Sequence, residues 1–451
     1  MENYNKRFTY FICFVSAMGG LLFGYDWVVI GGAKIFYEQY FDIVGNPAMQ
    51  GLAMSIALAG CLVGALTSGM LADRLGRKSL LLISAFIFAT TAYGTGAFDS
   101  FTPFLIIRFL GGIAIGIASG LSPMYIAEVA PSSVRGKLVS LNQLTIVVGI
   151  LSAQIVNWLL VSDDTAWNIE RAWRWMFWAA AFPACAFLLL ALFIPESPRW
   201  LAMKGRNEKA LATLTQIGGK EYAASEMRAF EQAEAEKQSQ GGLKVLFSKP
   251  YRLVLTIGII IAMFQQWCGT NVIFNYAQEI FQSAGYDVDN TFINIVVTGI
   301  ANLIFTFVAI YTVDRLGRRA LMLIGAGGLA GIYAILGLCY YMEMSGILMV
   351  SLVVLAIACY AMSLGPVTWV LISEIFPNRV RAVAVATATF ALWVASCTLT
   401  YTFPFLNTFL GTSGTFWIYA GICLAGFLFF LKKLPETKGK SLEELEKELL
   451  K

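Results

Sequence analysis

The chain has 451 residues, of which 58% are hydrophobic and 13% are charged, and its formal net charge is +4. A soluble protein of this length could not cover so much apolar surface, so the composition predicts a protein that lies mostly in a lipid bilayer. The sequence contains no histidine, which removes the commonest metal ligand and the usual proton shuttle near neutral pH. We therefore expect no metal and no cofactor.

Apolar stretches long enough to cross a bilayer, about 20 residues each, occur in two sets along the chain. They lie near 9–33, 49–72, 78–97, 101–126, 138–161 and 172–194, and again near 251–282, 290–313, 320–341, 346–374, 380–405 and 412–432. The charged, alanine-rich segment between the sets reads as short amphipathic helices outside the bilayer. The pattern predicts an all-α integral membrane protein with 12 transmembrane helices, divided into 1–196, a linker over 197–249, 250–434 and a tail over 435–451.

Lysine and arginine concentrate in alternate connections, for example around 74–78, 135–137, 197–249 and 315–319, whereas the opposite connections are acidic or neutral. The positive-inside rule therefore places both termini and the linker in the cytoplasm. No Asn-x-Ser/Thr glycosylation acceptor occurs in the sequence, which favours a bacterial cytoplasmic (inner) membrane.

The two sets of spans are copies of one another. "LADRLGRKSLLL" (71–82) matches "TVDRLGRRALML" (312–323), "YIAEVAPSSVRG" (125–136) matches "LISEIFPNRVRA" (371–382), and "PESPRWL" (195–201) is echoed by "PETKGKSL" (435–442). The offsets are 241, 246 and 240 residues. Two parallel six-span repeats are typical of transporters in which one half moves against the other around a site at the membrane midplane.

These motifs, together with the Gln-Gln pair of the seventh span, resemble the sugar porter family of the major facilitator superfamily over essentially the whole chain. Among its branches, the likeness is greatest to bacterial sugar–proton symporters of the xylose and glucose type. The resemblance implies proton-coupled import of a neutral monosaccharide, a pentose or hexose, by alternating access. It implies a monomer whose partners are sugar, protons and lipid, with no nucleic acid and no enzymatic activity. The alternatives are an uncoupled sugar uniporter, a carrier of a polyol such as inositol, and a membrane sugar sensor.

The seventh span, "FQQWCGTNVIFN" (264–275), contains four amide side chains within about three turns. Amides at this depth are costly unless they face a cavity or a partner, and they match sugar hydroxyls as both donors and acceptors without charge. Hydrogen bonding between helices is the alternative. Gly269 would let the span bend or unwind, and Pro366 would kink the tenth span. From the residues and the resemblance together, the candidate sugar-binding residues are Phe23, Gln143, Gln265, Gln266, Asn271, Asn275, Asn302, Gly365, Trp369 and Trp393.

Three positions depart from the family pattern. Asn275 replaces a tyrosine, Leu392 replaces a polar residue before Trp393, and Ala180 replaces a glutamate that assists proton transfer in some xylose symporters. The first two bear on which sugar is carried, and the third leaves fewer proton carriers.

The repeated charged motifs predict ion pairs at the cytoplasmic ends of the spans, where they would hold one arrangement and break in the other. A purely topogenic role is the alternative. The predicted network, including residues carried over by resemblance, is Asp73, Arg74, Arg77, Glu128, Arg135, Glu196, Arg199, Asp314, Arg315, Arg318, Glu374, Arg381 and Glu436.

Asp26 and Arg108 are isolated charges within the first and fourth spans, each about 10 Å below the outer edge of the hydrocarbon. Each would be expensive alone at that depth, so we expect them to face one another. Arg108 stays charged, whereas Asp26 can exchange a proton, which makes the pair the candidate coupling site. A permanent structural ion pair is the alternative.

Overall fold

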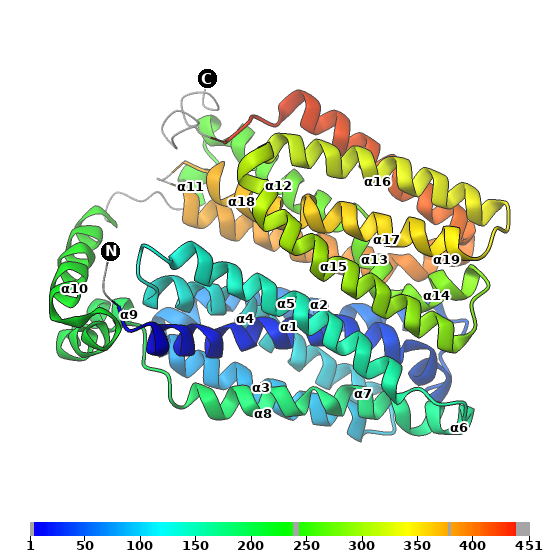
Figure 1. The fold of residues 1–451 in the computed structure, drawn as a ribbon, viewed down its shortest axis with the longest axis horizontal. Coiled ribbons are helices and arrows are strands. Elements are labelled where there is room, and N and C mark those ends of the chain that lie inside the picture. Colours follow the sequence, from blue (N-terminus) through cyan, green and yellow to red (C-terminus); the bar gives the residue numbers. More distant parts are fainter. Residues whose placement is uncertain (1–3, 238–242, 378–379, 439–451) are drawn as a thin grey trace. The chain divides into compact units, whose positions relative to one another are not determined.

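The computed structural model describes residues 4–237, 243–377 and 380–438, and this part of the chain is helical with irregular connections (Figure 1). It contains 11 helices that are long and apolar enough to cross a membrane. The last of them lies in α19 (Arg381–Lys433), which is interrupted at Gly411, where φ is 69° and ψ is 175°. Because that backbone is not helical, α19 comprises two spans, and the predicted fold of 12 transmembrane helices is confirmed.

The helices follow the predicted order. The first five spans are α1 (Lys6–Tyr40), α2 (Pro47–Leu75), α3 (Arg77–Ala97), α4 (Phe101–Val129) and α5 (Arg135–Leu160), and the sixth comprises α6 (Thr165–Trp167), a π-helical turn (Asn168–Ala172), α7 (Trp173–Ala179) and α8 (Ala181–Ala191). The later spans are α12 (Arg252–Trp267) with α13 (Thr270–Asn275) and α14 (Ala277–Ser283), then α15 (Val288–Leu316), α16 (Arg318–Tyr341), α17 (Ile347–Met362) with α18 (Leu364–Glu374), and α19.

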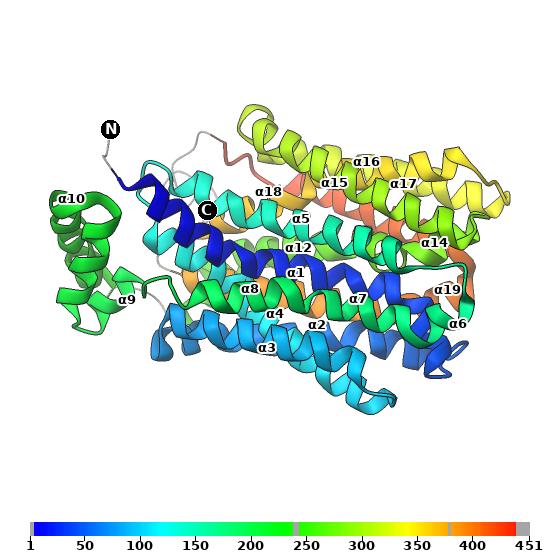
Figure 2. The same cartoon turned by 60° about the horizontal axis from the view of Figure 1, so that its bottom comes forward.

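The predicted amphipathic linker contains α9 (Pro198–Met203), α10 (Asn207–Lys237) and α11 (Leu243–Leu246). In both views α9 and α10 lie beyond one end of the neighbouring spans rather than among them (Figures 1 and 2). The N–H of Asn5 donates to the carbonyl of Ile217 at 2.7 Å, so the start of α1 is attached to α10. The N-terminus and the linker therefore share one end of the spans.

The chain packs as two compact units. Unit 1 is Met1–Val29, Ile56–Val156 and Glu170–Ser239, and unit 2 is Ile30–Ser55, Asn157–Ile169 and Gln240–Lys451. The division at the linker stays a prediction, and the packing adds that the ends of α1, α2 and α5 group with unit 2. Most of the predicted tail, residues 439–451, lies outside the described residues.

In unit 1, helices α2 and α4 approach one another along glycines. A Cβ added to Gly112 would lie 1.9 Å from the carbonyl oxygen of Ala57, and one added to Gly116 would lie 2.1 Å from that of Cys61. On the facing helix, a Cβ on Gly60 would lie 2.1 Å from the carbonyl oxygen of Phe109. Small residues at a crossing allow backbones to touch, which is how helices gain packing energy in lipid.

In unit 2, two spans are broken where the sequence predicts a break. Gly269 has φ 86°, a left-handed conformation that separates α12 from α13 in the seventh span. In the tenth span α17 ends at Met362 and α18 begins at Leu364, just before Pro366. A proline clashes with the carbonyl four residues before it, which here is that of Met362. Both predicted interruptions are confirmed.

Candidate functional site

Asp26 on α1 and Arg108 on α4 form an ion pair within unit 1. Nη1 of Arg108 donates to Oδ1 of Asp26 at 2.7 Å, and the two side chains are 3% and 18% exposed for Arg108 and Asp26, respectively. The guanidinium lies over the ring of Phe177, 5.3 Å from its centroid. Oδ2 of Asp26 and Nε of Arg108 are buried without a hydrogen-bond partner among the described residues. A single direct contact thus joins a buried guanidinium to a half-buried carboxylate, and this pair lacks the bidentate geometry that makes such pairs strong.

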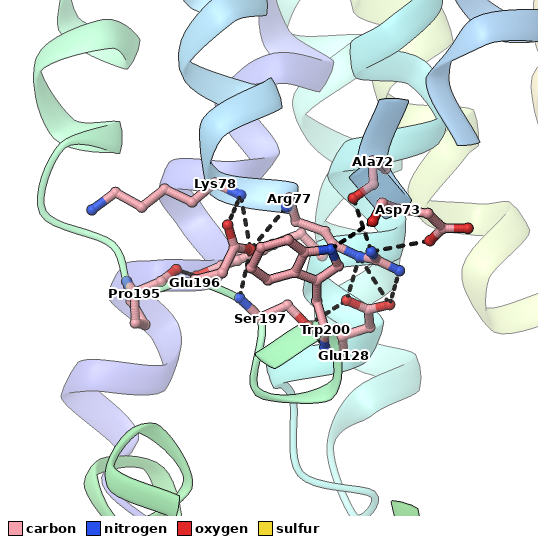
Figure 3. Close-up of polar contacts among 10 residues, drawn as sticks. Ala72, Asp73, Arg77, Lys78, Glu128, Pro195, Glu196, Ser197 and Trp200 are labelled. Atoms are coloured by element: carbon pink, nitrogen blue, oxygen red, sulfur yellow. Dashed lines mark hydrogen bonds and ion pairs between the residues drawn. The ribbon is translucent and has the colours of Figure 1, made fainter. Parts of the chain in front are cut away.

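A second charged cluster lies where α2, α3, α4 and α9 meet in unit 1 (Figure 3). Nε of Arg77 is 3.0 Å from Oε2 of Glu128, and Nη2 is 3.0 Å from Oε1, so this pair is bidentate. Nη1 of Arg77 also donates to the carbonyl of Ala72 at 3.0 Å and lies 3.2 Å from Oδ1 of Asp73. The hydroxyl of Ser197 donates to Glu128 as well. The Arg77 guanidinium therefore ties the end of α2 to α4.

Glu196 caps the first turn of α3. Its Oε1 accepts from the backbone N–H of Arg77 at 2.8 Å and from that of Lys78 at 3.1 Å (Figure 3). A carboxylate is favoured at this position because a helix N-terminus carries partial positive charge and unpaired N–H groups. Gly76, with φ 96°, allows the approach, since a Cβ there would lie 2.3 Å from Oε2 of Glu196.

Unit 2 contains the same arrangement in its own copy of the motifs. Nη2 of Arg318 donates to Oε1 of Glu374 at 3.1 Å, and the hydroxyl of Thr437 donates to Oε2 of Glu374 at 2.6 Å. Glu436 accepts from the backbone N–H of Arg318 at 3.0 Å and from that of Arg319 at 3.1 Å. The sequence repeat is therefore a repeat of contacts as well.

The other residues of the predicted network lie outside these pairs. Nε of Arg135 and of Arg381 donates to a carbonyl in the turn before its own helix, those of Ala130 at 3.3 Å and Phe376 at 3.1 Å. The remaining arginines, at positions 74, 199 and 315, are exposed. The side chain of Asp314 lies outside the described residues.

The amides of the seventh span form a chain of hydrogen bonds in unit 2. Asn271 donates to Oε1 of Gln266, Gln266 donates to Oε1 of Gln265 at 2.6 Å, and Gln265 donates to the hydroxyl of Tyr360 on α17 at 3.0 Å. The three amide residues are at most 8% exposed. The break at Gly269 brings Asn271 of α13 to Gln266 of α12, although the two would not share a face of a straight helix.

The other predicted sugar-binding residues differ in exposure. In unit 2 Asn275, Asn302 and Trp393 are buried, and Trp369 is 42% exposed. Oδ1 of Asn275 has no hydrogen-bond partner among the described residues. A Cβ on Gly365 would lie 3.3 Å from Cε1 of Tyr360, so this glycine adjoins the amide chain. In unit 1, Phe23 stands edge-on to Trp27 with centroids 5.6 Å apart, and Gln143 is half-buried on α5.

The family description "Sugar (and other) transporter" matches residues 12–449. The chain belongs to this family. Among its relatives, the arabinose–proton symporter of Bacillus subtilis is 38% identical over 99% of this chain and 96% of its own length. The D-xylose–proton symporter of Escherichia coli is 38% identical over 98% and 96%, and the glucose facilitated diffusion protein of Zymomonas mobilis is 34% identical over 96% of both chains. The inward-open structure of the xylose transporter XylE from E. coli superposes with a TM-score of 0.87 at 37% identity, over 97% of this chain and 99% of that one.

As a member of the sugar transporter family, the chain is a multi-pass membrane carrier rather than an enzyme. Its departures from the family pattern are apolar or unpaired here. Leu392 and Ala180 are buried, and Ala180 lies at the junction of α7 and α8. Ala180 has no ionisable group, so it cannot carry a proton toward Asp26.

The sequence did not point to Tyr360 or to a buried trio, Lys34, Glu38 and Glu279. Tyr360 is a single tyrosine within the apolar run of α17, and nothing around it in the sequence indicates a polar contact. In the sequence, Lys34 and Glu38 look like the polar end of the first span. Their spacing of four residues could have indicated an ion pair, because it places them side by side on a helix.

Proposed function

We propose that this chain imports a neutral monosaccharide together with protons by alternating access. The observation that carries the proposal is the Asp26–Arg108 pair, in which a half-buried carboxylate is held by one direct contact and its buried second oxygen has no hydrogen-bond partner among the described residues. Protonation of this carboxylate would remove the free-energy cost of an imperfectly paired charge away from water.

The proposed cycle starts with a proton that reaches Asp26 from the outside. The neutral carboxyl no longer holds Arg108, whose charge still lies against the face of Phe177. Release of the pair permits closure around sugar, and loss of sugar and then of the proton to the inside restores the pair. When sugar binds, hydrogen bonds to its hydroxyls would replace those that Asn271, Gln266 and Gln265 make with one another, so that no amide is left unpaired.

We also propose that both termini and the linker are cytoplasmic, since the N-terminus is attached to α10 and the basic residues lie in the connections at that side. The Arg77 and Arg318 clusters would then brace the cytoplasmic ends of their units, and the whole chain would function as a monomer. Their role in opening and closing that side stays a prediction.

The test is uptake of a panel of labelled pentoses, hexoses and inositol into proteoliposomes, with and without an imposed proton gradient. We expect accumulation of a neutral monosaccharide above its outside concentration only when the gradient is present. The relative from Zymomonas is a facilitated diffusion protein, so uncoupled uniport is the competing function. Equilibration that ignores the gradient would favour it.

Gln266→Ala is expected to weaken sugar binding without unfolding the protein. It removes an acceptor for Asn271 and a donor to Gln265, and a lost hydrogen bond costs about 0.5–1.5 kcal/mol, or roughly two- to tenfold in affinity. Equilibrium binding of labelled sugar and a thermal melt check the two parts. Gln216→Ala, at an exposed glutamine of α10, is the matched control. Wild-type affinity and transport in a well-folded Gln266→Ala protein would place the sugar elsewhere.

A further inference from the structure

A buried cluster of three charges lies in unit 2, separate from the Asp26 pair. Nζ of Lys34 on α1 contacts Oε1 of Glu279 on α14 and lies 2.9 Å from Oε1 of Glu38, one turn further along α1. The side chains are 4%, 6% and 23% exposed for Lys34, Glu38 and Glu279, respectively. One ammonium thus faces two carboxylates, at a place from which water is largely excluded.

Among the described residues, the contacts of the cluster include no second cation. Nε2 of Gln50 on α2 donates to Oε2 of Glu38 at 2.9 Å, and the ring of Tyr276 faces Nζ of Lys34 with its centroid 5.3 Å away. Tyrosines at positions 37 and 419 act on Tyr276, the ring that faces Lys34. Oε2 of Glu279 is buried without a hydrogen-bond partner among the described residues. With all three groups ionised, the cluster has one uncompensated negative charge, and a buried group in that position takes up a proton instead.

Lys34 is the group that stays charged. It contacts both carboxylates and the π face of Tyr276, and each of these favours the ammonium form. The proton that balances the cluster is therefore held by the carboxylates, which face Lys34 from α1 and from α14.

The cluster joins two elements that can separate. α14 has seven residues and lies between two interruptions, at Tyr276 (φ −124°, ψ 26°) and at Gly285 (φ 86°). Besides the cluster, the amide of Gln278 attaches it to α1: Nε2 donates to the carbonyl of Gly32 at 2.7 Å, and Oε1 accepts from the N–H of Ile35 at 3.4 Å. In transporters, discontinuous helices line the substrate site, and alternating access moves one part of the fold against another around that site. If α14 left α1, Glu38 and Glu279 would reach water, where a glutamate is ionised at neutral pH.

We propose that Lys34, Glu38 and Glu279 form a second proton site, which holds one proton while α14 is docked on α1 and releases it to solvent when α14 leaves. Docking of this half-helix is then favoured by acid independently of Asp26. The inference rests on the proposed function only in that transport would require α14 to undock.

The test measures docking directly, without sugar and without a gradient. Spin labels at Val44→Cys and Gln282→Cys, two exposed positions of unit 2 on either side of the contact, report the distance between the end of α1 and α14. The native cysteines that are not buried, at positions 185, 359 and 397, are replaced by alanine in this protein. Distance distributions recorded at pH values from about 5 to about 9, on either side of neutral pH, give the ratio of docked to undocked protein.

Because the docked state binds one more proton, this ratio should fall with rising pH, approaching tenfold per pH unit. Glu38→Gln balances the cluster without a proton, so we expect α14 to stay docked and the slope to vanish. Glu279→Gln should do the same and serves if the first variant does not fold. Asp289→Asn removes an exposed carboxylate of unit 2 and should leave the slope unchanged.

A ratio that does not vary with pH in the wild-type protein would overturn the proposal, as would a slope that survives both glutamine variants. Loss of the slope in Asp26→Asn would assign the proton to Asp26 and overturn it as well. An intact slope in a protein that fails to accumulate sugar would contradict the proposed function alone.

Discussion

Asp26→Asn is expected to abolish proton-driven accumulation while leaving sugar binding and exchange between equal pools intact. Asparagine mimics the protonated carboxyl, so the pair with Arg108 would stay released and the carrier would cycle without a proton. A proton-motive force of about 100 mV is worth about 2.3 kcal/mol per proton, or roughly 40-fold in sugar concentration for one proton. We expect the ratio of inside to outside sugar in proteoliposomes to fall from such a value to equality.

The control for this variant is Asp99→Asn, which breaks an exposed ion pair of the same unit, between Asp99 and Arg174 at 2.7 Å. Because exposed pairs contribute little, its accumulation should match the wild-type protein. Accumulation by Asp26→Asn against the sugar gradient under a proton-motive force would show that coupling occurs elsewhere. Loss of exchange as well as accumulation would show that the pair is structural.

Gly112→Val is expected to destabilise unit 1 more than any other single change discussed above. Even the first carbon of a side chain would lie 1.9 Å from the carbonyl oxygen of Ala57, so α4 and α2 must move apart along the whole glycine seam. Overpacking a core costs about 1–3 kcal/mol where neighbours can shift, and here the neighbour is backbone. We expect little monodisperse protein in detergent and a lowered melting temperature of any that remains.

Gly120→Val, on the same helix, is the control. It makes the same change in helix propensity at a position where the added Cβ does not clash. Its added Cβ would meet nothing nearer than Oγ of Ser68 at 3.7 Å, so the melting temperature should stay close to that of the wild-type protein. Equal loss in both variants would mean that the glycines of α4 matter for helix formation or insertion rather than for the seam with α2.

Hydropathy predicts the spans well because it measures what the bilayer selects, a run of apolar residues of the right length. The second span, predicted near 49–72, is α2 from Pro47 to Leu75. The first span, predicted to end near 33, continues to Tyr40. A hydropathy scale counts Lys34 and Glu38 as two separate charges, whereas the fold buries them as neighbours with Glu279.

The sequence indicates which residue types the candidate site contains, but it does not indicate their contacts. Four amides in one span indicate polar function from the sequence alone, and Gly269 indicates a break. The order of donors from Asn271 to Tyr360 depends on the angle of that break and on which helix packs beside it. Lys34 and Glu279 are 245 residues apart in the chain, so no local pattern joins them.

The duplicated clusters around Arg77 and Arg318 allow a comparison within a single chain, because the two copies of one arrangement differ at some positions and agree at others. Of the residues whose side chains make these contacts, three pairs are identical in the two copies: Arg77 and Arg318, Glu128 and Glu374, Glu196 and Glu436.

Two other positions have diverged without changing the contacts. Lys78 in one copy is Arg319 in the other. Both supply a backbone N–H to the capping carboxylate, and both side chains donate to a carbonyl at 2.8 Å, that of Leu192 and that of Leu431, respectively. Ser197 has become Thr437, and both donate a hydroxyl to the partner carboxylate. The chain thus records which changes this arrangement accepts. A replacement occurs where it keeps the donor, whether a main-chain N–H, a hydroxyl or a cationic side chain, and the paired guanidinium and carboxylates are the same in both copies.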